Sequence, residues 1–481
     1  MDTKNLRIGL TLSGGGHRAG AFHLGVLARL ADGNLLNKIK LVSTVSGGSI
    51  VMGLIYAANN NQWFTREAYK NHILPAMRKL YTERNLESDF MSHLTRFPIR
   101  WLRRRANHLA EALSEDWGMT GELSRLTSDP RWIINATTIE TGKNWRFDRE
   151  VMGDYKVGYT LSGKFPISEA VAASAGFPVF IGPLEFASQD YCFVETYAEA
   201  KKAVNKNCIG YRLSAEFELK ELNLWDGGLY DNLGIQAVLR HFKPEPRAHN
   251  NAESVSSSNL ELQLPMFDEL YRADRKEIDQ EQPTPEVARH AASTSSPDLE
   301  HDHTLDLESV KELKADHNRR LTKDQEAVNF LIVSDASPAI KPTSFDRKWS
   351  FKRLVTLPAD HTRMMYSKQI VTVMRAHPYS GAYLQFDNDV GYVLGRAKHK
   401  DHMLEDISDG EINQIAAESL SKKQIAKLAD FGTSVRKMTH HEFSGIYRHG
   451  YELADATLYA YNSELGAGFE HIPFKRHHPS P

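Results

Sequence analysis

The stretch SGGGHRAG, Ser13 to Gly20, combines three consecutive glycines with the spacing of a dinucleotide-binding fingerprint. Gly14, Gly16 and Ala19 fit G-x-G-x-x-G/A, but a dinucleotide site also needs an acidic residue about twenty positions further on. The sequence there is STVSGGS, and no Gly-Lys-Ser or Gly-Lys-Thr follows the glycines, which excludes a P-loop as well. Consecutive glycines also leave backbone N–H groups unobstructed, and such groups can stabilise the oxyanion of acyl transfer. The loop therefore fits an oxyanion hole better than a phosphate site.

A serine in the second glycine turn could act as a nucleophile. Ser46 stands between a predicted strand and a predicted helix, with Gly47 and Gly48 behind it. In the elbow motif G-x-S-x-G, a sharp turn exposes the serine hydroxyl and the helix N-terminus points N–H groups at it. The match is incomplete because Thr44 takes the place of the first glycine. A turn without a ligand is the alternative for each loop alone, and the two loops together favour a catalytic site.

A nucleophilic serine needs a base. Asp226, followed by Gly227 and Gly228, ends an apolar strand pattern, which predicts a carboxylate at the same edge of the sheet. An ordinary Asp-Gly turn is the alternative interpretation. The chain has 21 histidines, and no spacing singles one out as a triad member. The residues alone indicate Ser46 and Asp226 and leave a histidine open.

The elements around these residues follow the pattern of a parallel sheet. Residues 6–60 predict strand, turn, helix, strand, turn and helix, which is a βαβ unit with a right-handed crossover. After a charged, mainly helical region, strand patterns return; they lie at 132–137, 145–147, 222–225 and 330–335. Near the C-terminus, Thr439 and Glu442 have capping-box spacing ahead of an amphipathic helix, whose histidines we interpret as surface residues.

Composition changes sharply between residues 244 and 326, where Ser, Pro, Asn, Gln and charged residues replace large apolar ones. Such a segment cannot bury enough surface to offset its ordering entropy, so we predict a largely disordered, low-complexity insertion. The predicted organisation is a catalytic domain in two parts, 1–243 and 327–465, and a tail, 466–481.

The overall composition restricts the function classes. The 481 residues include 41% hydrophobic and 25% charged ones, which suits a globular protein, and the net charge of −2 does not indicate nucleic acid binding. The two cysteines have no zinc-ligand spacing, and no secretory signal is visible, so we expect a cytoplasmic location. The uncharged stretch from Leu41 to Thr65 contains too short an apolar run to cross a bilayer and predicts a buried helix. The sequence does not indicate an oligomeric state.

Four segments, taken in order, resemble the motifs of the patatin-like phospholipases: LSGGGHRAGAFHLGVL, STVSGGS, AASAGFPVFIGPLEF and WDGGLYDN. That family has a glycine-rich oxyanion loop with a basic residue, a G-x-S-x-G elbow, an Ala-Ser-x-x-x-Pro block, and Asp-Gly followed by Gly or Ala. The resemblance covers roughly residues 1–240 and 327–460. It implies an α/β fold of three layers, α/β/α, with a mainly parallel central sheet.

The resemblance also implies a Ser–Asp dyad, in which Ser46 is the nucleophile and Asp226 the base that accepts its proton. We expect burial to make this carboxylate a stronger base. No metal or organic cofactor is implied. The other implied site residues are Gly14, Gly15, Gly16 and Arg18 at the oxyanion hole and, as supporting positions, Gly48, Ser174, Pro178, Gly227 and Gly228.

The predicted function is hydrolysis of ester-linked fatty acids of membrane phospholipids, as in a phospholipase A. Two alternatives stay open: an esterase or thioesterase acting on soluble acyl substrates, and a regulated effector, in toxin action or defence, that is inactive until triggered. The cluster from Phe97 to Arg105 mixes aromatic residues with arginines and could make a peripheral membrane contact, although the pattern favours a solvated helix face.

Overall fold

The computed structural model describes residues 5–96, 105–178, 180–194, 197–202, 220–244, 327–338 and 350–474. The chain divides into two units, residues 1–245 with 324–481 and residues 246–323, and all described residues belong to the first unit. The predicted insertion, except for residue 244, and residues 97–104 of the arginine cluster lie outside the described residues.

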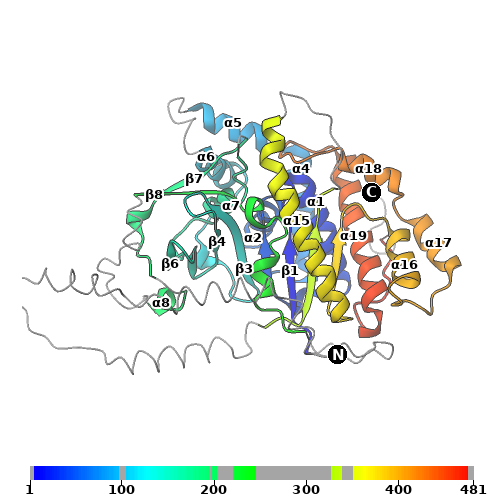
Figure 1. Ribbon diagram of the computed structural model, residues 1–481. Coiled ribbons are helices and arrows are strands. Elements are labelled where there is room, and N and C mark those ends of the chain that lie inside the picture. The colour runs from blue at the N-terminus through cyan, green and yellow to red at the C-terminus, as the bar shows by residue number, and fades with distance from the viewer. Residues whose placement is uncertain are drawn as a thin grey trace, which may run out of the picture. The chain divides into compact units, whose positions relative to one another are not determined.

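One sheet organises the first unit (Figure 1). Its strand order is β10-β9-β1-β2-β3-β4-β5-β6, and β8 pairs with both β3 and β7. The five strands from β10 to β3 are parallel to one another, and the remaining pairings are antiparallel. The strands are β1 (Ile8–Leu12), β2 (Ile39–Thr44), β3 (Arg131–Thr138), β4 (Asn144–Phe147), β5 (Val151–Asp154), β6 (Gly158–Leu161), β7 (Leu184–Ala187), β8 (Glu221–Asp226), β9 (Phe330–Asp335) and β10 (Gly381–Gln385).

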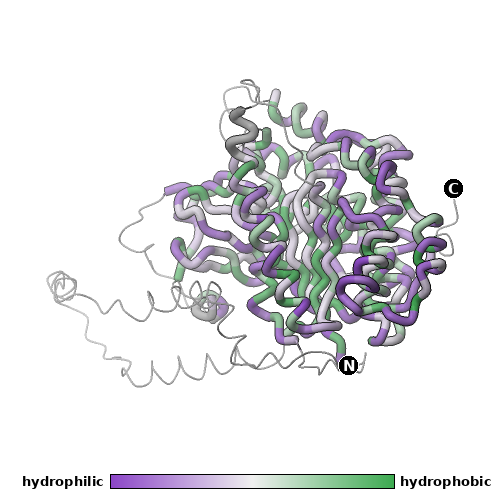
Figure 2. The backbone as a smooth tube through the Cα atoms, turned by 45° about the vertical axis from the view of Figure 1, so that its right-hand side comes forward, coloured by the Kyte–Doolittle hydropathy of each residue, from purple (hydrophilic) through white to green (hydrophobic). Residues whose placement is uncertain are grey.

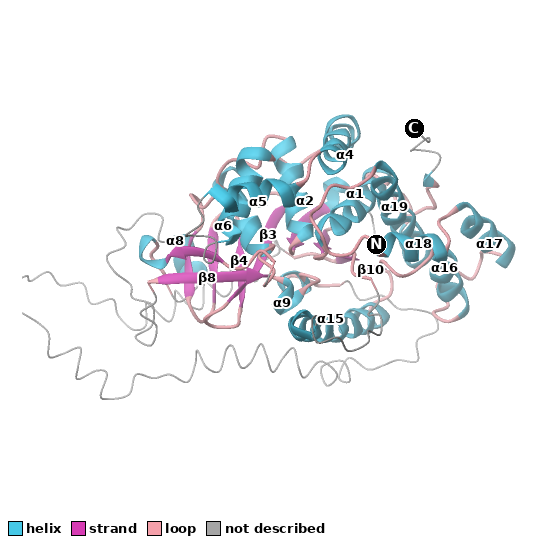
Figure 3. Ribbon diagram, turned by 90° about the horizontal axis from the view of Figure 1, so that it is seen from above, coloured by secondary structure: helices cyan, strands magenta, loops and turns pink. Residues whose placement is uncertain are grey.

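Helices cover both faces of this sheet. In Figure 3, α15 and α9 lie on one side of the strands, and α1, α2 and α4 on the other. The α-helices are α1 (Gly16–Asp32), α2 (Gly47–Ala58), α3 (Arg66–Ala68), α4 (Leu74–Glu83), α5 (Leu86–Arg96), α6 (Arg105–Glu111), α7 (Ile167–Ser174), α8 (Tyr197–Lys202), α9 (Gly228–Asp231), α10 (Ile235–Leu239), α15 (Ser350–Ala376), α16 (Val390–His399), α17 (Asp409–Glu418), α18 (Lys422–Ala429) and α19 (His440–Asn462).

Two hydrophobic clusters correspond to the two faces. Ile8, Leu10 and Leu12 of β1 belong to a large cluster with side chains of α1, α2 and α19. Leu331 and Val333 of β9 belong to a second cluster with side chains of α10 and α15. The central strands accordingly form a hydrophobic band in Figure 2. The fold is thus a mixed α/β fold of three layers with a mainly parallel central sheet, as predicted.

The predicted βαβ unit is confirmed as β1, α1 and β2, and α2 follows directly. The stretch from Leu41 to Thr65 contains α2, whose residues Gly47–Tyr56 are all buried, so the buried-helix interpretation is correct. Among the described residues, no helix has both the length and the apolar character that a membrane span requires.

The direction of β8 differs from the parallel arrangement that we expected. Thr44, the last residue of β2, is level with Ile134 of β3, and β3 continues beyond it. On the side of β3 that β2 no longer occupies, the end of β3 pairs antiparallel with β8, and Asp226 lies opposite Ala136. Asp226 therefore reaches the carboxyl edge of the parallel strands from the opposite direction.

Candidate active site

Ser46 occupies a strained turn at the N-cap of α2. Its φ of 51° lies in a region that residues with side chains rarely adopt, and such strain persists only where the surroundings enforce it. Ser46 is half-buried, whereas its neighbours from Leu41 to Tyr56 are all buried. The turn is tight because α2 starts directly against β1: a Cβ added to Gly48 would lie 2.4 Å from the Leu12 carbonyl oxygen. The turn therefore holds Ser46 at a fixed place, where the residue stays partly accessible.

The glycine loop packs directly against this turn. A Cβ added to Gly14 would lie 3.1 Å from the Cβ of Ser46, and one added to Gly47 would lie 2.6 Å from the amide nitrogen of Gly16. Gly15 and Gly16 have positive φ values of 138° and 62°, which favour glycine. Side chains at these positions would separate the two turns.

The three glycine amides are not equivalent. The N–H of Gly14 donates to the carbonyl oxygen of Asn232 at 3.2 Å. The amides of Gly15 and Gly16 donate to no acceptor within the described part of the chain; Gly15 is half-buried and Gly16 is buried. Gly14 thus anchors the loop, and the next two amides can bind a ligand oxygen.

Asp226 is buried, and its carboxylate accepts the amide of Gly228 at 2.7 Å. Burial raises the pKa of Asp226 to about 6, although the Gly228 amide and the nearby Ser46 side chain both act in the opposite direction. A carboxylate with this pKa is charged at neutral pH and accepts a proton more readily than an ordinary aspartate.

Ser174 joins the nucleophile turn to the aspartate turn. Its Oγ accepts the amide N–H of Ser46 at 3.0 Å, and its carbonyl oxygen accepts the amide of Gly227 at 3.2 Å. The amide of Asp226 donates to the carbonyl oxygen of Gly176 at 3.1 Å. Pro178 is buried just beyond this segment. The block that we expected to be scaffold is thus in direct contact with the dyad.

Arg18 lies beneath the glycine loop. It is buried, its Nε donates to the carbonyl oxygen of Ala336 at 3.3 Å, and a Cβ added to Gly15 would lie 3.3 Å from its Nη2. Burial, together with the nearby charge of Arg363, lowers the pKa of Arg18 to about 10. The guanidinium therefore stays charged at neutral pH next to the loop.

Two histidines near the loop have structural contacts only. His17 bonds through Nδ1 to the carbonyl oxygen of Arg436 at 2.9 Å, and His23 bridges the Ser334 hydroxyl and the Ser13 carbonyl oxygen. Burial lowers the pKa of both to about 4, so both are neutral at pH 7. Within the ranges that the structure describes, no histidine hydrogen-bonds to Ser46 or Asp226.

Residues 10–239 match the family model described as patatin-like phospholipase. This part of the chain is a patatin-like phospholipase domain. Membership of this family indicates lipid acyl hydrolase activity in general terms. The comparison with curated proteins found no match.

Among solved structures, this chain is similar to human GIVD cytosolic phospholipase A2, with TM-score 0.29 and 17% identity over 37% of this chain and 28% of that chain. For the same protein in complex with methyl gamma-linolenyl fluorophosphonate, the values are 0.28, 15%, 45% and 34%. VipD from Legionella pneumophila aligns with TM-score 0.24 and 11% identity over 93% of this chain and 91% of that chain. This chain spans about a third of the length of the human structures.

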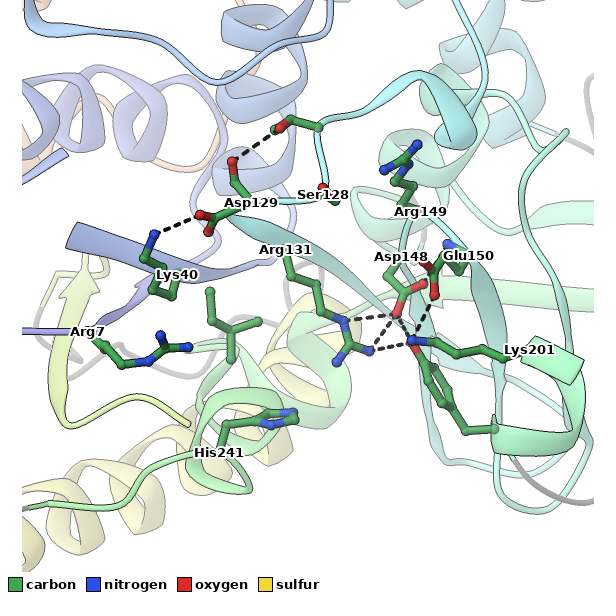
Figure 4. A pocket seen from close by; sticks show the side chains of 13 residues that line it. Arg7, Lys40, Ser128, Asp129, Arg131, Asp148, Arg149, Glu150, Lys201 and His241 are labelled. Carbon is green, nitrogen blue, oxygen red and sulfur yellow. Dashed lines mark hydrogen bonds and ion pairs between the residues drawn. The ribbon is translucent and has the colours of Figure 1, made fainter. Parts of the chain in front are cut away.

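A cavity of about 320 Å³ lies at the opposite edge of the patatin-like domain (Figure 4). Arg7, Lys40 and Arg131, at the starts of β1, β2 and β3, contribute to its wall. Its ion pairs join Lys40 to Asp129 at 2.7 Å, Arg131 to Asp148 at 2.5 Å, and Lys201 to Glu150 at 2.7 Å. The dyad lies at the carboxyl ends of the strands, so this cavity is separate from the candidate active site.

Sequence reasoning missed two contacts of the site. Asn232, which accepts the amide of Gly14, also donates from Nδ2 to the hydroxyl of Ser337 at 3.0 Å and so ties the glycine loop to the segment after β9. Thr44, which departs from the elbow glycine, bonds through Oγ1 to Ser49 and Trp132. No local sequence signal marks either contact, because the partners are distant along the chain or are ordinary hydroxyl residues.

Proposed function

We propose that this chain is a phospholipase of the A type, which hydrolyses ester-linked fatty acids of membrane phospholipids through a Ser46–Asp226 dyad. The observation that carries the proposal is that the Ser46 side chain lies near enough to the buried Asp226 carboxylate to lower its pKa. Beside it, the amides of Gly15 and Gly16 have no other acceptor in the described part of the chain. A nucleophile, a base and oxyanion donors in one place are the components of acyl transfer.

The proposed reaction has two steps. Asp226 takes the hydroxyl proton as Ser46 Oγ attacks the ester carbonyl carbon, and the Gly15 and Gly16 amides donate to the resulting oxyanion. The C–O bond to the lysophospholipid then breaks, and the proton on Asp226 passes to the departing alkoxide. In the second step Asp226 takes a proton from water, which attacks the acyl-enzyme, releases the fatty acid and restores the Ser46 hydroxyl. Arg18 adds a fixed positive charge under the loop.

The first experiment is covalent labelling with a fluorophosphonate probe, followed by mass spectrometry of the labelled peptide. We expect labelling at Ser46 in the wild-type chain, none in Ser46→Ala, and strongly slowed labelling in Asp226→Asn. Asp231→Asn is the matched control, because Asp231 is equally buried but accepts backbone amides only. Equal labelling of the wild type and Ser46→Ala would disprove the proposal.

The substrate class needs its own measurement. Release of fatty acid from phospholipid vesicles, compared with hydrolysis of short-chain esters and acyl thioesters, separates a phospholipase from an esterase or thioesterase.

The cluster Phe97 to Arg105 supplies the proposed peripheral membrane contact. Its last residue, Arg105, begins α6 and donates to the carbonyl oxygen of Phe180, close to the segment that contacts the site. Replacement of Arg103, Arg104 and Arg105 by glutamate should weaken vesicle binding without changing the hydrolysis of soluble esters. Unchanged vesicle binding would remove the membrane contact. The cytoplasmic location stays a prediction.

A further inference from the structure

Three hydroxyl side chains form a continuous chain of hydrogen bonds behind the nucleophile. Thr44 Oγ1 lies 2.8 Å from Ser49 Oγ, and Ser49 Oγ lies 2.8 Å from Ser174 Oγ. All three residues are completely buried. They come from the end of β2, the first turn of α2 and the end of α7, so the chain connects three elements.

Both ends of this hydroxyl chain are held by N–H donors. The indole Nε1–H of Trp132 donates to Thr44 Oγ1 at 2.9 Å, and the amide N–H of Ser46 donates to Ser174 Oγ at 3.0 Å. Trp132 is itself buried on β3 and stacks on Tyr56 with ring centroids 5.0 Å apart. The hydroxyl chain therefore runs from a rigid part of the core to the backbone of the nucleophile.

The backbone of Ser46 needs such support. The φ of Ser46, 51°, is strained. The hydrogen bond from the Ser46 amide N–H to Ser174 Oγ helps to fix the orientation of this peptide group. A small rotation there would move the serine hydroxyl relative to Asp226 and to the amides of Gly15 and Gly16. Positioning errors of about 1 Å can lower rates by about a hundredfold.

We propose that Thr44, Ser49 and Ser174 are positioning residues that hold the Ser46 turn in its reactive geometry, and that Thr44 is an integral part of this elbow. The inference rests on the proposed function of Ser46 as the nucleophile. It reverses the simple expectation from the G-x-S-x-G motif. Glycine at position 44 would restore the motif, yet it would leave the Trp132 indole N–H buried without its acceptor and would remove one of the two hydroxyl partners of Ser49. Thr44→Gly should therefore lower activity.

The test compares Thr44→Val, which keeps the shape but removes the hydroxyl, with Thr44→Ser, which keeps the hydroxyl. The readouts are the rate constant and the stoichiometry of fluorophosphonate labelling of the full chain. We expect Thr44→Val and Thr44→Gly to label about tenfold more slowly at unchanged stoichiometry, and Thr44→Ser to stay near the wild type. With ester substrate, kcat should fall and KM should change little.

Thr11→Val is the matched control. Thr11 is a fully buried threonine on β1, and its hydroxyl has no hydrogen-bond partner among the described residues. Loss of this hydroxyl should leave the labelling rate unchanged. If Thr44→Val does not fold, Ser49→Ala removes the middle hydroxyl and places a better helix former in α2.

The outcomes are distinct. Slow labelling by Thr44→Val with rescue by Thr44→Ser supports the inference. Wild-type rates with reduced stoichiometry indicate a purely structural role and overturn it, as does equally slow labelling by Thr44→Ser and Thr44→Val. A wild-type chain that is not labelled at Ser46 at all overturns the proposed function, and this inference with it.

Discussion

At the scale of single residues, two buried carboxylates lie close together in the sequence but have different partners. Burial raises the pKa of both Asp226 and Asp231 to about 6. The Asp231 carboxylate accepts hydrogen bonds from the amides of Leu233 at 3.0 Å and Gln236 at 2.8 Å. These bonds hold its side chain in the turn before α10. Asp226 accepts one backbone amide, and the Ser46 side chain lies near its carboxylate. Of the two carboxylates, Asp226 is therefore the proposed base.

This difference predicts a pH dependence. Asp226 acts as a base only when it is deprotonated, so the labelling rate of Ser46 should fall about tenfold for each pH unit below a midpoint near 6. The rate should be constant between about pH 7 and 8. Labelling with a probe that does not titrate, measured between pH 4.5 and 8, gives the midpoint. The midpoint should persist in Asp231→Asn; a midpoint that moves with this substitution would assign the titration to Asp231 instead.

The same pKa predicts a stability effect. The folded-state pKa of Asp226 is raised from 3.8 to about 6, so the folded state binds the proton more tightly than the unfolded state. Ionisation of Asp226 thus destabilises the fold progressively as pH rises from about 4 to 6, and fully above that range. Asp226→Asn removes this charge, and should stabilise the protein at pH 7 by up to about 3 kcal/mol while abolishing activity. Urea denaturation at pH 7 and pH 4 measures the difference, which should shrink to about 0.5 kcal/mol at pH 4. A variant that is less stable than the wild type at pH 7 would contradict it.

The placement of Ser46 and Asp226 in glycine turns at strand ends could be predicted from the sequence, and their action as a dyad stays a prediction. The positioning hydroxyls could not be predicted. Ser174 lies 128 positions from Ser46 along the chain, and only the packing of α7 against α2 brings it to the Ser46 amide. Thr44 stood out as a departure from a motif, and its role depends on the Trp132 indole, which local patterns do not connect to it.

At the scale of elements, α1 and α19 cross at two glycines. A Cβ added to Gly25 would lie 1.9 Å from the Tyr447 carbonyl oxygen, and one added to Gly450 would lie 2.0 Å from the Phe22 carbonyl oxygen. Nearby, the buried pair of Arg29 and Asp455 joins the same two helices at 2.6 Å. Because α1 begins at the glycine loop, this crossing also holds the helix that carries the loop of the candidate active site.

The close approach predicts a large effect of one methyl group. Gly25→Ala should destabilise the protein by about 3 kcal/mol or more, since the backbones must separate and the gain in helix propensity is only about 1 kcal/mol. Gly395→Ala is the control, because Gly395 lies within α16 with no atom within 4 Å of an added Cβ, and should be neutral or stabilising. Thermal and urea denaturation measure both variants. Equal stability of the two would contradict the crossing.

Elements with strong local signals could be predicted. The capping box of Thr439 and Glu442 starts α19 as expected, and His440 and His441 are exposed. The surface interpretation is wrong for His449 of the same helix, which is buried and bonds to the Phe386 carbonyl oxygen at 2.6 Å. The antiparallel direction of β8 had no such signal, because an apolar strand pattern carries no direction. The long helix α15 contains Pro358, which ordinarily interrupts a helical pattern. It is stabilised by tertiary contacts instead, including the Arg363–Asp335 pair at 2.9 Å.

At the scale of the whole molecule, the region after the insertion completes both the sheet and the site. Strand β9 pairs with the whole length of β1, from Ile8 opposite Phe330 to Leu12 opposite Ser334. The amide of Ser13, at the start of the glycine loop, donates to the Ser334 carbonyl oxygen at 3.1 Å. The family model ends at residue 239, so the matched segment lacks one neighbour of its first strand.

Hydrogen bonds connect the described segments that precede and follow residues 246–323. The amide of Lys243 donates to the Val328 carbonyl oxygen at 2.8 Å, and the amide of Val328 donates to the His241 carbonyl oxygen at 2.8 Å. Phe242 and Val328 form a parallel bridge. The two ends are thus held next to each other by the first unit itself, and a flexible link of about ten residues is long enough to connect them.

We therefore expect a chain in which ten Gly and Ser residues replace residues 246–323 to fold and to label at Ser46 with the wild-type rate constant. The control is a chain that ends at residue 245, which lacks β9, β10 and α19 and should not fold, because β1 loses a partner strand and α1 loses the helix that it crosses. Circular dichroism, thermal denaturation and fluorophosphonate labelling compare the three proteins. A folded replacement that labels faster or slower than the wild type would assign residues 246–323 a regulatory role. A folded, labelled chain ending at residue 245 would show that the catalytic unit needs nothing beyond the segment matched by the family model.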